Sequence, residues 1–181
     1  TRCGMMMRLI DRVMSGIRGG SRRQKPGDAA YLAIVARARR PHWYVDGGVA
    51  DNVDGRFDMI AAILCMVLLR LEAGEESAQL SVAITESFVD DMDGQLREIG
   101  IGDIVVGKHV GKMMGMLGGR LGAYREGLAQ RDLSRALVRN LYRDVTPTDD
   151  ALAHVNAALL RLSDHLAELD LDAIEAGELP E

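Results

Sequence analysis

An unbroken apolar run constrains this chain more than any other feature, because no residue from Met59 to Leu69 is polar. A surface helix shows polar residues on every turn, so a segment that is apolar all round has to be covered on all sides. Periodicity alone does not separate a buried helix from a buried strand, but strands usually end after about 4–8 residues. At about 1.5 Å of rise per residue, the run also covers only about half of a ~30 Å hydrocarbon core. We therefore predict a buried central helix over residues 58–71, with Asp58 at its N-cap, and not a membrane span.

The composition fits a helical bundle around that segment. Hydrophobic residues make up 48% of the 181 positions and aromatic residues only 4%, so the core is aliphatic, which favours helices over a β-sandwich. Apolar residues recur at helical spacing over residues 80–99 and 152–169, and Trp43 is expected to close the edge of the core. We predict an all-α, single-domain bundle.

The N-terminal region is predicted to stand apart from this bundle. Residues 4–17 have helical spacing, and residues 19–27 form a polar linker with glycine and proline. The chain is therefore divided into an N-terminal helix with a mobile basic linker, residues 1–27, and a helical domain, residues 28–181. The net charge of −5 gives no general indication of nucleic-acid binding and none of DNA, although the chain is basic before Pro41 and acidic after Asp144.

One predicted helix, residues 106–128, is unusually rich in glycine. Four of its glycines lie four residues apart: Gly107, Gly111, Gly115 and Gly119. Each glycine inside a helix costs of order 1 kcal/mol relative to alanine, so this loss of stability needs a reason. Glycines at this spacing form a stripe without side chains, along which another backbone can come close. The stripe is interpreted either as tight packing against the central helix or as a groove for a helix of a partner.

Basic residues border this stripe. They are Lys108, His109, Lys112 and Arg120, with Arg97 on the preceding helix. Their stems can cover apolar surface of the protein itself. Alternatively, their charges can flank a groove for an apolar peptide with acidic flanks, or bind RNA phosphates.

The patterns of catalytic and metal sites are missing. The four histidines form no HExxH motif and no ligand pair with cysteine: His42, His109, His154 and His165. The two cysteines, Cys3 and Cys65, form no CxxC, which favours a reducing compartment. Asp90, Asp91 and Asp93 lack the closing glutamate of a calcium loop. We predict a protein that is not an enzyme and that carries no metal and no cofactor.

Four blocks of the sequence point to a family. They are DGRFDM (Asp54–Met59), MDGQLREIGIGD (Met92–Asp103), VGKHVGKM (Val106–Met113) and GRLGAY (Gly119–Tyr124). In this order, between residues 43 and 124, they resemble the ubiquinol–cytochrome c chaperone family. The resemblance implies an all-helical assembly chaperone of ubiquinol–cytochrome c reductase that holds newly made cytochrome b. It also implies a small co-chaperone, a ribosome contact as in mitochondrial members, and a place in the bacterial cytoplasm near the inner membrane, or in the mitochondrial matrix.

The resemblance and the glycine stripe together give a hypothesis for client binding. Cytochrome b consists of apolar helices, so a protein that holds it needs an apolar groove with polar edges. In this hypothesis methionines supply adaptable apolar contacts, and Lys108, Lys112 and Arg120 form a basic rim. The predicted client-binding residues are Arg97, Gly107, Lys108, Gly111, Lys112, Met113, Gly115, Met116, Gly119 and Arg120. Two alternatives stay open: a helical scaffold that acts through its acidic C-terminal helix, and a ribosome- or RNA-associated factor that uses its basic N-terminus.

Overall fold

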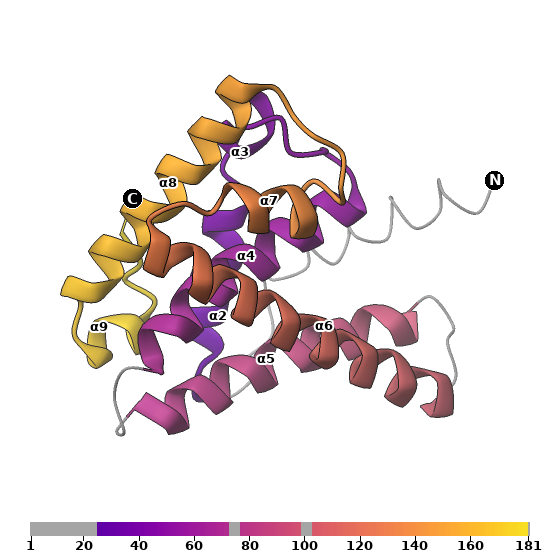
Figure 1. The fold of residues 1–181 in the computed structure, drawn as a ribbon. Coiled ribbons are helices and arrows are strands. Elements are labelled where there is room, and N and C mark those ends of the chain that lie inside the picture. The colour runs from indigo at the N-terminus through magenta and orange to yellow at the C-terminus, as the bar shows by residue number, and fades with distance from the viewer. Residues whose placement is uncertain (1–24, 73–76, 99–102, 181) are drawn as a thin grey trace.

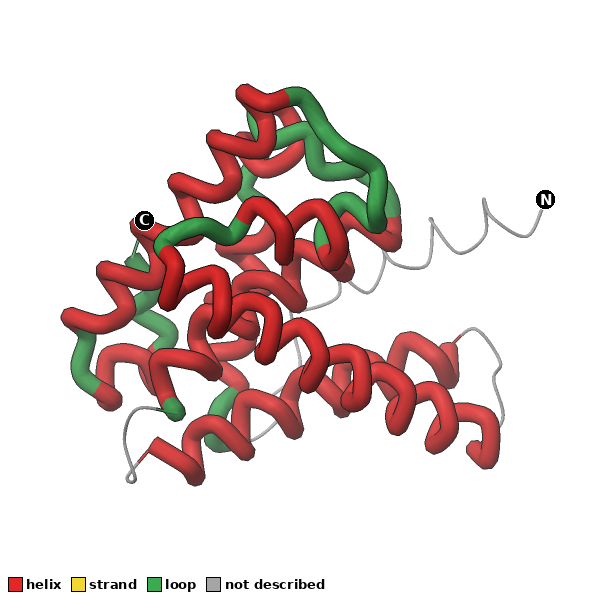
Figure 2. The backbone as a smooth tube through the Cα atoms, in the orientation of Figure 1, coloured by secondary structure: helices red, strands yellow, loops and turns green. Residues whose placement is uncertain are grey.

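The computed structural model describes residues 25–72, 77–98 and 103–180, with the side chains of residues 95–98, 103–110, 112 and 113 left out. Within these ranges the chain forms helices and no strand, which confirms the all-α prediction (Figures 1 and 2). The helices are α2 (Asp28–Ala38), α3 (His42–Val45), α4 (Val53–Leu71), α5 (Ala78–Glu98), α6 (Asp103–Gln130), α7 (Ser134–Asn140), α8 (Asp149–Glu168) and α9 (Leu171–Ala176). The helix predicted over residues 4–17 and most of the predicted linker lie outside the described residues.

Helix α4 is the buried centre of the fold. Every residue from Met59 to Leu68 is at most 5% exposed, because α2, α5, α6 and α8 all pack against this helix (Figure 1). Burial of one large aliphatic side chain contributes about 1.5–3 kcal/mol to folding, so the burial of this run contributes strongly to the stability of the core. The predicted central helix is confirmed.

The start of α4 differs from the prediction. The helix begins at Val53, and the side chain of Asn52 caps it by accepting a hydrogen bond from the Gly55 amide at 2.8 Å. Asp58 is therefore not the N-cap but lies inside the helix, where it is 1% exposed. The prediction failed because the polar turn before the apolar run is itself helical.

The other side of the core is built by α8 and by α3. Thr148 caps α8 by accepting a hydrogen bond from the Ala151 amide at 3.3 Å, and the leucines of α8 face α4. Leu159, Leu162 and Leu166 are each at most 1% exposed, so the apolar residues predicted at helical spacing over 152–169 form one wall of the bundle. Trp43 is fully buried, and its indole N–H donates to the Arg37 carbonyl at 2.9 Å. The prediction that Trp43 closes the core is thereby confirmed.

Two histidine rings join α3 to α8, and this contact predicts a dependence of stability on pH. His42 Nδ1 lies 2.9 Å from His154 Nε2, and such a bond needs at least one neutral ring. The pKa of His42 lies below its ordinary value of 6.5, first because of burial and then because of His154, Arg37 and Arg40, while Asp46 opposes the shift.

Below about pH 6.5 the unfolded chain therefore binds more protons at His42 than the folded chain does, so the folded state loses stability as the pH falls through this value toward the lower folded pKa. We expect a lower melting temperature at about pH 5.5 than at about pH 7.5, and a smaller difference in His154→Gln, measured by circular dichroism. An equal difference in the wild-type chain and in His154→Gln would show that the histidine pair does not cause it.

Candidate functional site

Helix α6 buries one side against the bundle. Leu117 and Tyr124 on this side are 4% and 1% exposed, and Arg120 lies between them at 7%. These residues recur every three or four positions, as expected for one helix face. The glycines of α6 fall largely on the opposite side.

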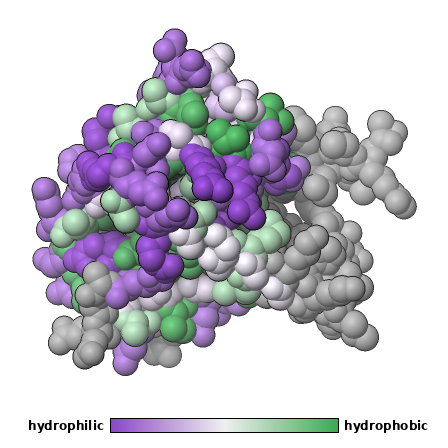
Figure 3. Space-filling view, in the orientation of Figure 1, coloured by the Kyte–Doolittle hydropathy of each residue, from purple (hydrophilic) through white to green (hydrophobic). Residues whose placement is uncertain are grey.

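That opposite side is open. Among the described residues, a Cβ added at Gly111, Gly115, Gly118, Gly119 or Gly122 would meet no atom outside its own helical neighbourhood within 4 Å, and we call these five positions the open glycine face. Four of them follow one another in steps of four, three and four, which gives a narrow stripe along the helix. Met114 and Met116 lie beside it with 37% and 41% of their surface exposed. Figure 3 shows pale residues of intermediate hydropathy where α6 runs, below a hydrophilic region over α7.

The open glycine face predicts opposite effects for the same substitution at two helical glycines. Gly118→Ala meets open space, so we expect it to raise the free energy of unfolding by about 1 kcal/mol through helix propensity. In Gly55→Ala the new Cβ would lie 2.0 Å from the Ala50 carbonyl oxygen, so we expect a loss of about 1–3 kcal/mol. Urea denaturation of both variants checks the pair, and destabilisation by Gly118→Ala would show that the face is covered.

A buried ion cluster lies on the inner side of α6. The carboxylate of Asp58, whose side chain has no exposed surface, accepts from Arg120 Nη2 at 2.5 Å and from Arg143 Nε at 2.6 Å. Arg143 Nη1 also lies 3.0 Å from Asp54 Oδ2 at the surface. The hydrogen bond to Asp58 is the main cause that raises the pKa of Arg143. The cluster ties α4, α6 and the segment after α7 together around one carboxylate.

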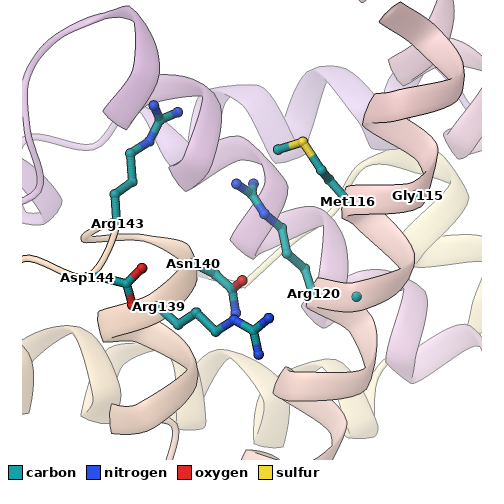
Figure 4. Close-up of a pocket in the computed structure, with 8 residues that line it drawn as sticks. Gly115, Met116, Arg120, Arg139, Asn140, Arg143 and Asp144 are labelled. Carbon is teal, nitrogen blue, oxygen red and sulfur yellow. The ribbon is translucent and has the colours of Figure 1, made fainter. Parts of the chain in front are cut away.

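A pocket of about 620 Å³ opens between α6 and α7 beside this cluster (Figure 4). Its α6 wall holds Arg120 together with members and neighbours of the open glycine face, and its other wall comes from the end of α7 and the residues that follow. The lining residues are Gly115, Met116, Gly119, Arg120, Arg139, Asn140, Arg143 and Asp144. In Figure 4 the side chains of Arg139 and Asn140 point from α7 toward α6. The pocket and the open glycine face are thus continuous through Gly115 and Gly119.

The described residues offer no metal-binding cluster and no reactive thiol. They contain no group of three or more His, Cys, Asp or Glu residues that could hold a metal ion. The thiol of Cys65 is buried, and burial raises its pKa to about 12, so it is no nucleophile near neutral pH. None of the described helices combines the length and the hydropathy that a membrane crossing requires.

Comparison with known proteins identifies the family of this chain. Residues 45–180 match the family described as Ubiquinol-cytochrome C chaperone. The chain belongs to this family. It is also similar to the crystal structure of the Cbp3 homolog from Brucella abortus, with a TM-score of 0.73 and 30% sequence identity, over 97% of this chain and 93% of that chain. A comparison with curated proteins gave no significant match.

The family confirms the resemblance that the four sequence blocks carry, and it supports a chaperone of ubiquinol–cytochrome c reductase. It also indicates an assembly factor without enzymatic activity.

The structure brings part of the predicted site together. Gly111, Gly115 and Gly119 share the open glycine face with Met116 at its edge, so the stripe is not filled by the central helix. Arg120 turns inward to Asp58 and reaches only the pocket. The remaining predicted positions lie outside what the structure describes: the side chains of Arg97, Lys108, Lys112 and Met113, and the surroundings of Gly107.

Several residues of the candidate site were missed from the sequence. Gly118 and Gly122 belong to the open glycine face, and a search for heptad steps instead of steps of four would have found them. Arg139 and Arg143 reach the pocket from a segment distant in sequence, and no local signal marks them. Asp58 did carry a signal, since an acid beside a buried apolar run needs a cationic partner.

Proposed function

We propose that the chain holds newly made cytochrome b by binding one of its apolar helices along the open glycine face of α6. The family supplies the client complex, ubiquinol–cytochrome c reductase, whose assembly the chaperone serves. The observation that carries the proposal is that Gly111, Gly115 and Gly118 leave free space along the outer side of α6. A glycine stripe of this kind lowers the stability of an isolated helix, and the packing of another helix on it offsets that loss.

The chemistry of the surface suits an apolar helix. Small residues allow the two backbones to approach closely, where dispersion and weak Cα–H···O contacts add up along the helices. Met114 and Met116 border the stripe with flexible, polarizable side chains, which adapt to different apolar neighbours. The surface can therefore cover an unassembled helix without requiring one exact sequence.

Photo-crosslinking tests this proposal. A photoreactive amino acid is placed at Met114, beside the open glycine face, or at Val82, an apolar position on α5 that is 57% exposed. Each full chain is then present during cell-free synthesis of cytochrome b. We expect adducts to cytochrome b from Met114 at about ten times the yield from Val82, the ratio that about 1.4 kcal/mol of preferential binding gives. Equal yields from both positions would contradict binding at this face.

The other implications of the sequence resemblance stay predictions. They are a small co-chaperone, a ribosome contact, and a location in the bacterial cytoplasm next to the inner membrane. Two hypotheses compete with this proposal. The acidic outer surface of α8 supports a scaffold, and the basic residues 1–24 support an RNA-associated factor. The crosslinking yields separate them from the proposal, because neither alternative requires contact at Met114.

A further inference from the structure

The pocket between α6 and α7 is rich in hydrogen-bond donors. Each guanidinium has five N–H donors, and the described contacts of Arg120 and Arg143 with Asp54 and Asp58 use only part of them. Arg139 lines the same pocket, is exposed, and makes no ion pair within the described part of the chain. Arg139 thus has no ion-pair partner among the described residues, although the carboxylate of Asp144 also lines this wall of the pocket.

The segment after α7 that lines the pocket has an unusual backbone conformation. Arg143 and Asp144 both have left-handed backbones, with φ of 54° and 63°. Two consecutive non-glycine residues in this region are rare and persist only where the surrounding structure fixes them. The bonds from Arg143 to Asp54 and Asp58 provide that fixation. The donors of Arg143 are therefore positioned before a ligand arrives, which lowers the entropy cost of binding at this part of the pocket.

The size and place of the pocket connect it to the open glycine face. Its volume of about 620 Å³ admits a large side chain with its neighbours. Gly115 and Gly119 belong to both surfaces, so a helix that lies along the face carries a side chain to the mouth of the pocket within one helical turn.

From these observations we infer that the pocket binds an acidic side chain of the helix that lies on the open glycine face, with Arg139 as its main cation. This inference rests on the proposed function and names the chemistry that the client must present. A carboxylate in an apolar membrane helix is costly until it is paired, so a chaperone can supply the pairing cation before the client is assembled. Arginine matches a carboxylate with two parallel hydrogen bonds, which fixes the register of the helix as well as its affinity.

The test uses two arginines of α7. Arg139 lines the pocket, and Arg135, one turn earlier, is also exposed but does not line it. Each is changed to Glu in the full chain with the photoreactive amino acid at Met114, and adducts to cytochrome b from cell-free synthesis are quantified. We expect Arg139→Glu to lower the yield about tenfold through loss of the pair and like-charge repulsion. Arg135→Glu should change it less than twofold, as for a rim charge outside the pocket. Arg139→Lys should give a yield between those of the unchanged chain and of Arg139→Glu, because the charge is retained but the two parallel hydrogen bonds are lost.

A charge reversal completes the experiment. Mass spectrometry of the adduct identifies the client segment, which should contain Asp or Glu within about one helical turn of the attachment point. Changing that acid to Lys should restore capture by Arg139→Glu. Equal yields from the Arg139→Glu and Arg135→Glu chains, an attached segment without an acid, or failure of the reversal would each overturn the inference while leaving the proposed function intact. Absence of any adduct from the otherwise unchanged chain would overturn both.

A lipid phosphate is also an anion that arginine binds. Binding to vesicles of phosphatidylglycerol distinguishes it from a client carboxylate. We expect Arg139→Glu and Arg135→Glu to sediment equally with such vesicles. Vesicle binding that only Arg139→Glu abolishes, with client capture unchanged, would assign the pocket to lipid phosphate and overturn the inference.

Discussion

Asp58→Asn is expected to lower the free energy of unfolding by about 3–5 kcal/mol, because it leaves the buried guanidinium of Arg120 without a countercharge. The amide has nearly the shape of the carboxylate, so the loss is one of charge and not of packing. Arg143 loses its bond to the same group but is half exposed and can turn to water. Asp58 lies in the second turn of α4, the buried central helix, so the whole domain is expected to unfold more easily.

Asp54→Asn is the matched control, since Asp54 also pairs with Arg143 but is 64% exposed. An exposed pair contributes about 0–1 kcal/mol, so this variant should remain close to the unchanged chain in urea denaturation. Removing both buried charges, as in Asp58→Asn combined with Arg120→Met, should recover part of the loss. Equal stability of Asp58→Asn and Asp54→Asn would show that the buried cluster does not stabilise the fold.

Gly118→Leu is expected to reduce capture of cytochrome b by more than about tenfold, a loss of over ~1.4 kcal/mol in binding, while the chain itself becomes more stable. Leucine has a higher helix propensity than glycine, and its side chain would enter open space, so a gain of about 0.5–1 kcal/mol in unfolding free energy follows. The same side chain would hold a client helix away from the α6 backbone. Capture is measured by the yield of adducts from Met114, and stability by urea denaturation.

This prediction distinguishes close helix packing from nonspecific hydrophobic binding. Leucine makes the outer surface of α6 more apolar, so a surface that bound clients by hydrophobicity alone would capture more cytochrome b after the substitution. A loss of capture in a more stable chain also excludes misfolding as its cause. Increased capture by Gly118→Leu would count against the role of the open glycine face.

The sequence predicted those parts of the fold where hydropathy alone decides the structure. The run from Met59 to Leu69 could only be covered on all sides, and the leucine stripe of α8 could only face inward. The start of α4 was misplaced because Asp58 looks like a cap until its partners are known. Arg120 and Arg143 lie 62 and 85 positions away along the chain, and such contacts carry no local pattern.

The glycines of α6 do not themselves show whether they face the core or the outside of the fold. A residue without a side chain has no hydropathy to reveal its surroundings, so tight packing and an open face give the same pattern. The decisive residues are Leu117 and Tyr124, which are large, apolar and seven positions apart. They show which side of α6 is buried, and the glycines between them then fall largely on the other side. The pocket was beyond prediction because α7 and the residues after it, which are distant in sequence from α6, supply half of its lining.

The most direct test of the central claim compares two leucines at exposed helical glycines. Gly94 on α5 resembles Gly118 in being helical and in having no neighbouring atom within 4 Å of an added Cβ, but it lies outside the open glycine face. Gly118→Leu and Gly94→Leu should therefore gain similar stability. In side-by-side capture of cytochrome b, we predict that Gly118→Leu loses more than about tenfold, over ~1.4 kcal/mol, and that Gly94→Leu changes less than twofold. Equal capture by the two variants would contradict binding at the open glycine face.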